Sequence, residues 1–298
     1  TAPRGVTVYG GDHSPWVQSV LLGLHEKKIA HRVITVPPLS VFLNSGILMP
    51  VARIDEGPWT LGSGEILADL GFSKVSSEDT LALFRALNGG VHRVDSGPRF
   101  WHRWSFVRDG RASLAGRLWN HFLRAFSVLY FYLTLKRFGR TLKRRTLDGR
   151  QFLYWERKLE QSRGPFLGGD QPDTLDLQLF GAVQCHCSIP VPPVPILKTD
   201  PALPQLREWL GAMHRRFADY PHLYSGGDFE PQMPPIQPAP LLERSAFWAG
   251  SVFMLAAFPI TIPLWAYYQH RVRSSGMLGM PAPRRTASPT DPQTSVKR

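Results

Sequence analysis

Few arrangements of side chains in this sequence could carry out chemistry, and the first of them is built around Ser14. Ser14 stands directly before Pro15, and proline is favoured at the first position of an α-helix because its missing N–H is not needed there. A helix N-terminus presents free N–H groups and a partial positive charge, which stabilise a thiolate held beside the serine hydroxyl. Serine is also a favoured capping residue. Catalysis and simple capping both stay open.

Cys185, His186 and Cys187 are the residues that most resemble a metal site. Residues two apart on a helix point to different faces, and no second Cys or His pair stands nearby. None of the ten histidines has a spacing such as HExxH. We therefore expect buried packing here and no bound metal. Two cysteines so close together also make a disulfide unfavourable and indicate a reducing or neutral compartment.

The elements that would position these residues fall into two parts. Residues 1–76 read as alternating strands and helices, and residues 77–225 read as helices only. The expected strands are 6–9, 31–36, 51–54 and 59–61, with helices at 15–25 and 65–70. The expected later helices are about 80–87, 99–107, 114–143, 152–161, 175–187 and 203–217. The sequence thus predicts an α/β domain followed by an all-α domain.

Residues 246–268 form a run of 23 residues without a charge. About 20 apolar residues in a helix are enough to cross the hydrocarbon layer of a bilayer. Trp248 and Trp265 lie toward its two ends, where amphipathic rings favour the water interface. Pro259 and Pro263 each remove a helical hydrogen bond, which predicts a kink. We interpret the run as one transmembrane helix; a buried core helix is the alternative.

The flanks of this run support a membrane location. A stiff, proline-rich linker is expected at 226–245 and a polar, basic tail at 269–298. Basic residues are more numerous after the run than just before it, which places the tail on the cytoplasmic or matrix side. Insertion after synthesis would give the reverse orientation. The sequence begins at Thr1 without a methionine or a cationic leader, so an already removed targeting segment is one interpretation.

The net charge of +12 is concentrated in one stretch. Residues 1–80 contain 6 Lys and Arg against 8 Asp and Glu, whereas residues 81–164 contain 18 against 5. A basic cluster follows a run of aromatic residues there; it consists of Lys136, Arg137, Arg140, Lys143, Arg144 and Arg145. We expect this cluster to meet membrane lipid headgroups or an acidic partner subunit, and not nucleic acid. A solvated helix face is the plainer alternative.

Three motifs in residues 5–224 resemble the glutathione S-transferase family, which has a thioredoxin-like N-terminal domain and an all-helical C-terminal domain. Ser14-Pro15-Trp16-Val17 is similar to the catalytic turn of the family, Met49-Pro50-Val51 to its cis-proline motif, and the segment from Phe166 to Asp176 to the start of a helix in its second domain. Within that segment, Asp173 and Asp176 are spaced as an N-cap pair.

The resemblance implies a fold and a ligand. The fold is an α/β thioredoxin-like domain plus an all-α domain, here followed by one transmembrane helix. The ligand is glutathione, whose sulfur Ser14 would activate while Met49, Pro50 and Ser63 bind the peptide. This chain departs from the family at Gly62, where a Glu or Asp usually precedes the serine. Loss of a charged contact of about 1.5–3 kcal/mol weakens binding by about 10- to 100-fold.

Two functions follow from these observations. In the first, the chain is a non-catalytic accessory subunit of a larger membrane complex, in which the transferase body is a docking surface for other membrane-protein subunits. Its layout is similar to that of metaxin-like tail-anchored proteins, so we expect a mitochondrial membrane and a respiratory-type complex. In the second, it is an active membrane-tethered transferase that uses Ser14. Fold alone does not decide between them.

Overall fold

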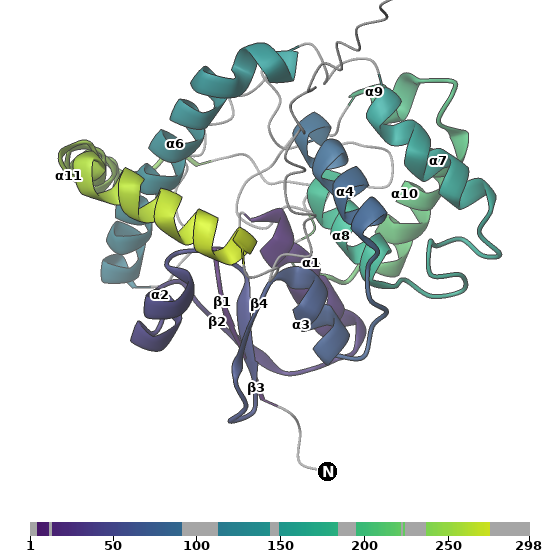
Figure 1. The fold of residues 1–298 in the computed structure, drawn as a ribbon, viewed down its shortest axis with the longest axis horizontal. Coiled ribbons are helices and arrows are strands. Elements are labelled where there is room, and N and C mark those ends of the chain that lie inside the picture. The colour runs from purple at the N-terminus through teal and green to yellow at the C-terminus, as the bar shows by residue number, and fades with distance from the viewer. Residues whose placement is uncertain are drawn as a thin grey trace, which may run out of the picture.

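The computed structural model describes residues 5–11, 14–90, 113–143, 149–183, 195–221, 223 and 237–274 (Figure 1). The helix expected at 99–107, the Cys185–Cys187 segment and most of the linker and tail lie outside these residues. In chain order the elements are β1 (Val6–Tyr9), α1 (Pro15–Glu26), β2 (His31–Ile34), α2 (Leu39–Ser45), β3 (Val51–Ile54), β4 (Trp59–Leu61), α3 (Ser63–Asp69), α4 (Ser77–Gly90), α6 (Leu114–Lys143), η1 (Arg150–Phe152), α7 (Leu153–Glu160), α8 (Thr174–Val183), α9 (Pro195–Thr199), α10 (Pro204–Arg216) and α11 (Leu241–Ser274).

The four strands form one mixed sheet in the order β2-β1-β3-β4. β1 pairs in parallel with β2, with Val8 opposite Val33, and antiparallel with β3, with Val8 opposite Ala52. β3 then pairs antiparallel with β4. A parallel pair needs a crossover connection, and α1 supplies it between β1 and β2. This is the thioredoxin-like arrangement expected from the sequence.

Helices cover both faces of this sheet (Figure 1). On one face, Val8 of β1 belongs to the main core together with side chains of α1 and α3. On the other face, Val41 of α2 packs with Tyr9 and Val51 in a small separate cluster. The sequence-based prediction missed α2, because only seven residues form it and just Val41 and Ser45 of them are buried. With so few buried residues, the sequence of α2 shows no amphipathic pattern.

The helical part shares its core with the sheet domain. Buried side chains of α4, α7, α8 and α10 belong to the same cluster as those of α1 and α3. Gly181 of α8 lies so close to α1 that an added Cβ would stand 2.7 Å from the carbonyl oxygen of Pro15. Backbone contact of this kind requires glycine. The two parts are therefore packed as one body.

Side-chain caps fix where two of these helices begin. The Oγ of Ser76 accepts a hydrogen bond from the Asp79 amide at 3.1 Å and donates to Asp79 Oδ2 at 2.7 Å, so the Ser76 side chain caps the N-terminus of α4. At α10, both carboxylate oxygens of the buried Glu156 accept backbone N–H groups, from Gln205 and Leu206, at 2.8 Å. A residue of α7 thus satisfies the free amides of a later helix.

α11 is longer than the expected transmembrane run. It begins at Leu241, so the last five residues assigned to the linker are helical, and that boundary was wrong. The proline-rich segment before α11 ends at Pro240. The carbonyl oxygen of Pro240 accepts a hydrogen bond from the Arg244 amide at 3.1 Å, so the helix begins directly after it. The helix continues through Pro259 and Pro263 to Ser274. Among the described residues, Leu241–Tyr268 is the one stretch long and apolar enough to cross a membrane.

The first half of α11 packs against α6 (Figure 1). Glu243 is 1% exposed, and its carboxylate bonds Arg117 Nε and His121 Nε2, each at 2.8 Å. Two turns further, a Cβ on Gly250 would stand 2.5 Å from the carbonyl oxygen of Phe122, which shows how closely the two helices approach. A buried ion-pair cluster and a glycine contact therefore hold α11 against α6.

Candidate functional site

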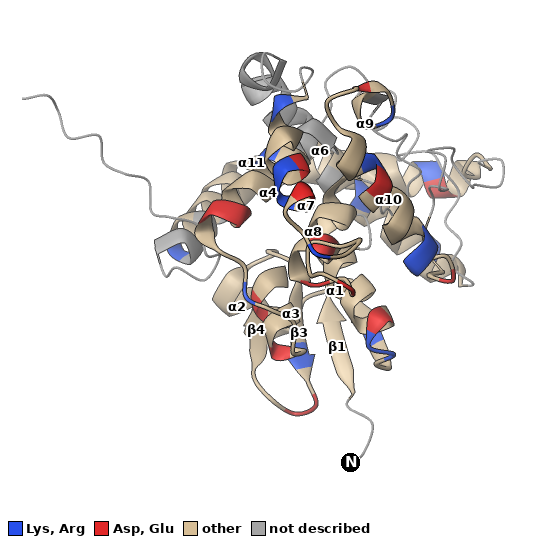
Figure 2. Ribbon diagram, turned by 90° about the vertical axis from the view of Figure 1, so that its right-hand side faces the viewer, with Lys and Arg blue, Asp and Glu red and all other residues tan. Residues whose placement is uncertain are grey.

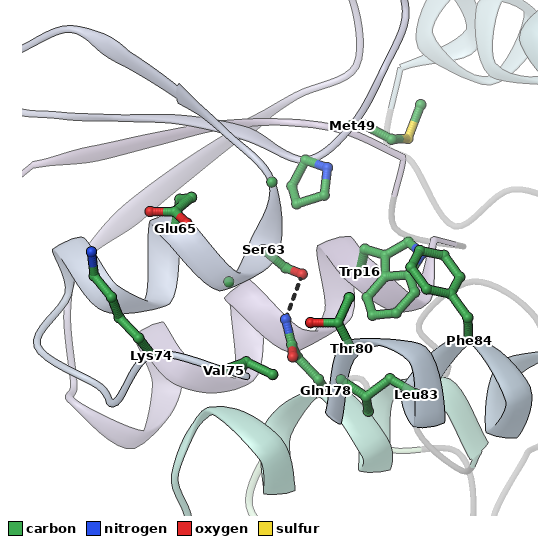
Figure 3. A pocket seen from close by; sticks show the side chains of 13 residues that line it. Trp16, Met49, Ser63, Glu65, Lys74, Val75, Thr80, Leu83, Phe84 and Gln178 are labelled. Atoms are coloured by element: carbon green, nitrogen blue, oxygen red, sulfur yellow. Dashed lines mark hydrogen bonds between the residues drawn. The ribbon is translucent and has the colours of Figure 1, made fainter. Parts of the chain in front are cut away.

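A cleft of about 160 Å³ lies between the sheet domain and the helices α4 and α8 (Figure 3). Its walls come from the start of α1, the turn before β3, the start of α3, the segment that leads into α4, and one residue of α8. The lining residues are Trp16, Met49, Pro50, Gly62, Ser63, Gly64, Glu65, Lys74, Val75, Thr80, Leu83, Phe84 and Gln178. Three residues expected to bind glutathione, Met49, Pro50 and Ser63, are therefore brought together in one cleft.

Ser63 and Gln178 form the polar floor of the cleft (Figure 3). Ser63 is 6% exposed, and its Oγ accepts a hydrogen bond from Gln178 Nε2 at 2.9 Å. The serine therefore keeps its own proton to donate to a ligand. Gln178 is 5% exposed, and its Oε1 has no hydrogen-bond partner. A buried carbonyl oxygen without a donor costs about 1–3 kcal/mol, so a ligand N–H that reached it would be stabilised.

Gly62 stands where the family has its acidic residue, and the backbone there has an unusual conformation. Its φ of 97° and ψ of 135° lie in a region that L-residues with a side chain rarely adopt. Glycine relieves the strain, which is of the order of 1–3 kcal/mol for such positions. Gly62 thus allows a turn of low strain at the entrance to α3. It has no carboxylate that could bind a ligand ammonium group.

The turn before β3 is tied to both neighbouring loops. The Met49–Pro50 peptide bond is cis, as the motif indicated. The carbonyl of Pro50 accepts the Gly62 amide at 2.9 Å. On the other side, the Gly11 amide donates to the Met49 sulfur at 3.2 Å. Hydrogen bonds therefore fix the cis-proline turn against the entrance to α3 and against the segment that leads to Ser14.

Ser14 lies at the N-terminus of α1 but does not line the cleft. It is 9% exposed, and its backbone is extended, as a residue just before a helix should be. Ser14 is the N-cap residue of α1, as the capping alternative expected, but its hydroxyl makes no capping hydrogen bond. Pro15 occupies the first helical position, as expected. The catalytic role of Ser14 remains a prediction.

The charges at the cleft lie on its rim. Glu65 follows Ser63 on the first turn of α3, and Lys74 precedes α4; both side chains are exposed. Aromatic and aliphatic side chains make up the opposite wall, where the rings of Trp16 and Phe84 are 5.2 Å apart. The cleft therefore combines two polar side chains at its floor, one charge of each sign at its edge and an apolar wall.

Asp173 and Asp176 are structural, as expected, and lie outside the cleft. The Asp173 amide donates to Asp176 Oδ2 at 2.9 Å, and Asp173 Oδ1 accepts the Thr174 amide at 2.8 Å. Asp176 also accepts the Leu167 and Gly168 amides and the indole N–H of Trp209. Burial raises the pKa of Asp176, and these four donors oppose that rise by stabilising the carboxylate.

No group of three or more His, Cys, Asp and Glu side chains among the described residues is arranged to hold a metal ion. The sequence-based prediction also did not identify Gln178, Trp16 or Phe84 as residues of the site. Gln178 is 115 residues from its partner Ser63, and no local pattern marks it. The aromatic residues look like ordinary core positions of their helices. A three-dimensional packing of α1, α4 and α8 is needed to bring them together.

Neither a protein-family model nor a curated protein matches the sequence. Among solved structures, a possible glutathione S-transferase from Rhodopseudomonas palustris is similar, with 15% identity over 76% of this chain and 99% of that chain and a TM-score of 0.39. A glutathione S-transferase from Rhodospirillum rubrum F11 has 16% identity, 81% and 99% coverage and a TM-score of 0.40. A theta class glutathione S-transferase from Xanthomonas axonopodis pv. citri has 16% identity, 74% and 98% coverage and a TM-score of 0.35.

Likenesses at these identities and TM-scores carry no statement about ligand or activity. The fold class rests on the topology itself: a sheet of order β2-β1-β3-β4, a cis-proline turn before β3, and a helical part joined to the sheet domain through α1 and α8. These features define a glutathione S-transferase-like fold, with a thioredoxin-like domain followed by helices.

Proposed function

We propose that this chain is a membrane-attached protein of glutathione S-transferase-like fold that serves as a non-catalytic accessory subunit of a larger membrane complex. The setting we infer is a mitochondrial membrane with a complex of respiratory type. Glutathione is a weak ligand of the cleft in this proposal, and α11 provides the membrane attachment. The partners are membrane lipid and other membrane-protein subunits.

The observation that carries the non-catalytic role is the composition of the cleft. Gly62 replaces the carboxylate that would bind the γ-glutamyl ammonium group, and Ser14 is not among the lining residues. A ligand in this cleft can use the hydroxyl of Ser63 and backbone groups beside Pro50, and it reaches the buried carbonyl oxygen of Gln178 only if that side chain moves. The ligand has a place to bind, and the described lining residues do not include Ser14, the residue expected to lower the pKa of the thiol.

Membrane attachment is supported by the surface of α11. Large apolar side chains along it are exposed, among them Val252 at 68% and Ile260 at 72%. A core helix of a soluble protein would have these side chains buried, because exposed apolar area costs about 25 cal/mol per Å². Lipid or another apolar partner therefore covers them. A single crossing is the mode that the length of α11 suggests, and it stays a prediction.

Titration calorimetry with reduced glutathione on the full chain in mild detergent tests the ligand part. We expect a dissociation constant in the millimolar range or weaker. Gly62→Glu should tighten binding by about 10- to 100-fold, since it adds a charged contact of about 1.5–3 kcal/mol. Backbone strain at the new side chain lowers stability in the free and bound states alike, so it leaves binding unaffected. A low-micromolar constant for the unmodified chain would contradict the accessory role.

Two further variants locate the ligand. Ser63→Ala should weaken the residual binding because it removes the donor at the floor of the cleft, whereas Ser40→Ala, at an exposed serine of α2, should leave it unchanged. Binding that is equal in all variants would place glutathione elsewhere.

The alternative function, an active transferase, has one observation in its favour. The Ser14 hydroxyl makes no capping hydrogen bond and stands at the positive end of α1. Conjugation of glutathione to an electrophilic chloronitrobenzene, measured against the uncatalysed rate, distinguishes the two functions. We expect no rate above background. A rate that disappears in Ser14→Ala would establish the enzyme.

A further inference from the structure

A second apolar surface of this protein is formed by α2. Its outer side is a ridge of large exposed side chains, which we define as Val36 (51% exposed), Leu39 (73%), Leu43 (58%) and Ile47 (55%). A single exposed apolar side chain is ordinary on a soluble protein, but four large apolar side chains along one short segment indicate a contact surface. The ridge belongs to the sheet domain, far in sequence from α11.

No charged residue interrupts the ridge. Between Arg32 and Arg53 the chain contains no Lys, Arg, Asp or Glu, and Figure 2 shows α2 without a coloured residue. Surfaces that face water carry charges at a much higher density. A run of 20 uncharged residues that includes an exposed helix is therefore suited to an apolar environment.

The ridge is continuous with α11. The ring of Tyr268, near the end of α11, lies 6.3 Å from the ring of Phe42 between centroids. A Cβ on Gly46 would stand 2.9 Å from the Tyr268 ring, so the contact is direct. Figure 1 shows α11 passing from α6 to α2. The exposed sides of α2 and α11 thus form one apolar face of the molecule.

This contact restricts how α11 can meet a bilayer. The 28 residues from Leu241 to Tyr268 extend about 40 Å as a helix, more than the ~30 Å of hydrocarbon in a bilayer. If α11 crossed the bilayer away from the body, Tyr268 would emerge on the opposite side and could not contact α2. In the structure the end of α11 near Tyr268 packs on α2 of the sheet domain, while Glu243 at its beginning is bonded to α6.

We propose that α2 and α11 together form a lipid-binding face that lies in one leaflet of a membrane, so that the sheet domain itself touches lipid. The occupant is a lipid surface because α11 carries no charge over 23 residues and exposes large apolar side chains along them, continuous with the ridge. The body takes the place of the polar face that an in-plane helix normally needs. This inference rests on the proposed membrane attachment and replaces the single crossing with an in-plane contact.

Flotation of the full chain with vesicles of phosphatidylcholine and phosphatidylserine is the first measurement. The unmodified chain should float with the vesicles. The double variant Leu39→Glu and Leu43→Glu should reduce the partition coefficient at least about tenfold, since two apolar contacts are lost. A matched control is Leu81→Glu with Leu153→Glu, two exposed leucines of α4 and α7. The control should float as the unmodified chain does.

A probe on the ridge separates this inference from the membrane attachment itself. An environment-sensitive fluorophore on Leu43→Cys, with Cys185 and Cys187 replaced by serine, should shift to the blue and be quenched by brominated lipid. The same probe at Leu153→Cys should not respond. If the chain floats but the probe at position 43 stays in water, the in-plane face is refuted and the attachment stands. If the chain does not float at all, the attachment also fails.

A tag placed after Arg298 tests the topology. With the chain added to preformed sealed vesicles, an in-plane helix leaves the tag open to external protease, together with the body. Protection of the tag alone would show a crossing and overturn the inference. A second copy of the chain is the remaining occupant of the ridge. A dimeric mass in detergent that Leu39→Glu with Leu43→Glu converts to a monomer would likewise overturn it.

Discussion

At the residue scale, the candidate site depends on how buried polar groups find partners. Ser63 and Gln178 satisfy one another only in part, because Gln178 Oε1 lacks a donor. Asp176 has the opposite arrangement, with four N–H donors on one carboxylate. The first pair lines the cleft and the second supports the fold. The unpartnered Gln178 oxygen at the cleft therefore needs an explanation that the fold alone does not supply, whereas Asp176 is explained by its four donors.

His214 provides a residue-scale prediction about pH. It is 5% exposed, neither ring nitrogen has a hydrogen-bond partner, and burial lowers its pKa to about 4. The unfolded chain binds this proton near pH 6.5 and the folded chain does not until about pH 4. The contribution of the neutral His214 to the free energy of unfolding is thus fully present above about pH 6.5. It is lost, by up to about 3 kcal/mol, as the pH drops to about 4.

Urea unfolding at several pH values, followed by tryptophan fluorescence, measures this dependence. His214→Leu should remove most of the loss of stability between about pH 6.5 and pH 4, while His31→Leu, at an exposed histidine, should retain it. If the two variants lose stability equally over this range, the effect does not come from His214.

The sequence predicted part of this site, and the remainder is set by packing between distant elements. Met49, Pro50 and Ser63 could be selected because each belongs to a short motif with its own backbone requirement. Gln178 could not, because its significance arises from a single hydrogen bond between α8 and α3. Gly62 was recognised as a departure from a motif, but its φ of 97° was visible only in the structure.

At the element scale, the strands and long helices were predictable and the short elements were not. The expected strands at 6–9, 51–54 and 59–61 and the helix at 114–143 have the bounds found in the structure. α2 and α9 were missed, because segments of seven and five residues contain at most two turns of any pattern. These short helices are positioned by tertiary contacts instead.

The seam between α6 and α11 leads to an element-scale prediction. Glu243→Ala removes the acceptor of both Arg117 and His121, and breaking a buried ion pair costs about 3–5 kcal/mol. Gly250→Leu should separate the helices directly, since a Cβ there already meets the Phe122 carbonyl oxygen at 2.5 Å. Hydrogen exchange in detergent should show loss of protection in α6 for both variants.

Ser245→Ala is the matched control, because Ser245 is exposed on the same turn of α11 as Glu243. It should leave the exchange of α6 amides as in the unmodified chain. Unchanged protection in both Glu243→Ala and Gly250→Leu would mean that α6 is held by other contacts.

At the scale of the whole molecule, charge and apolar surface are separated. Residues 1–80 hold 6 Lys and Arg against 8 Asp and Glu, and residues 81–164 hold 18 against 5. The α2 ridge and residues 246–268 of α11 contain no charged residue. A protein that only catalysed a reaction in its cleft would need neither surface. A subunit that rests on lipid and binds a partner needs both.

The basic cluster gives the whole-molecule prediction. If it docks an acidic subunit, the full chain purified from its own membrane in mild detergent should elute as a complex of fixed stoichiometry and a mass well above 33.6 kDa plus detergent. Exposed charge pairs are screened within about 3 Å at 1 M salt, so raising the salt from about 0.1 M to about 1 M should release the chain.

Replacing Lys136, Arg137 and Arg140 by glutamine should release the chain without added salt, whereas replacing Arg150, Arg157 and Arg163 by glutamine should not. A monomer under all these conditions would contradict the accessory role and leave only the lipid contact.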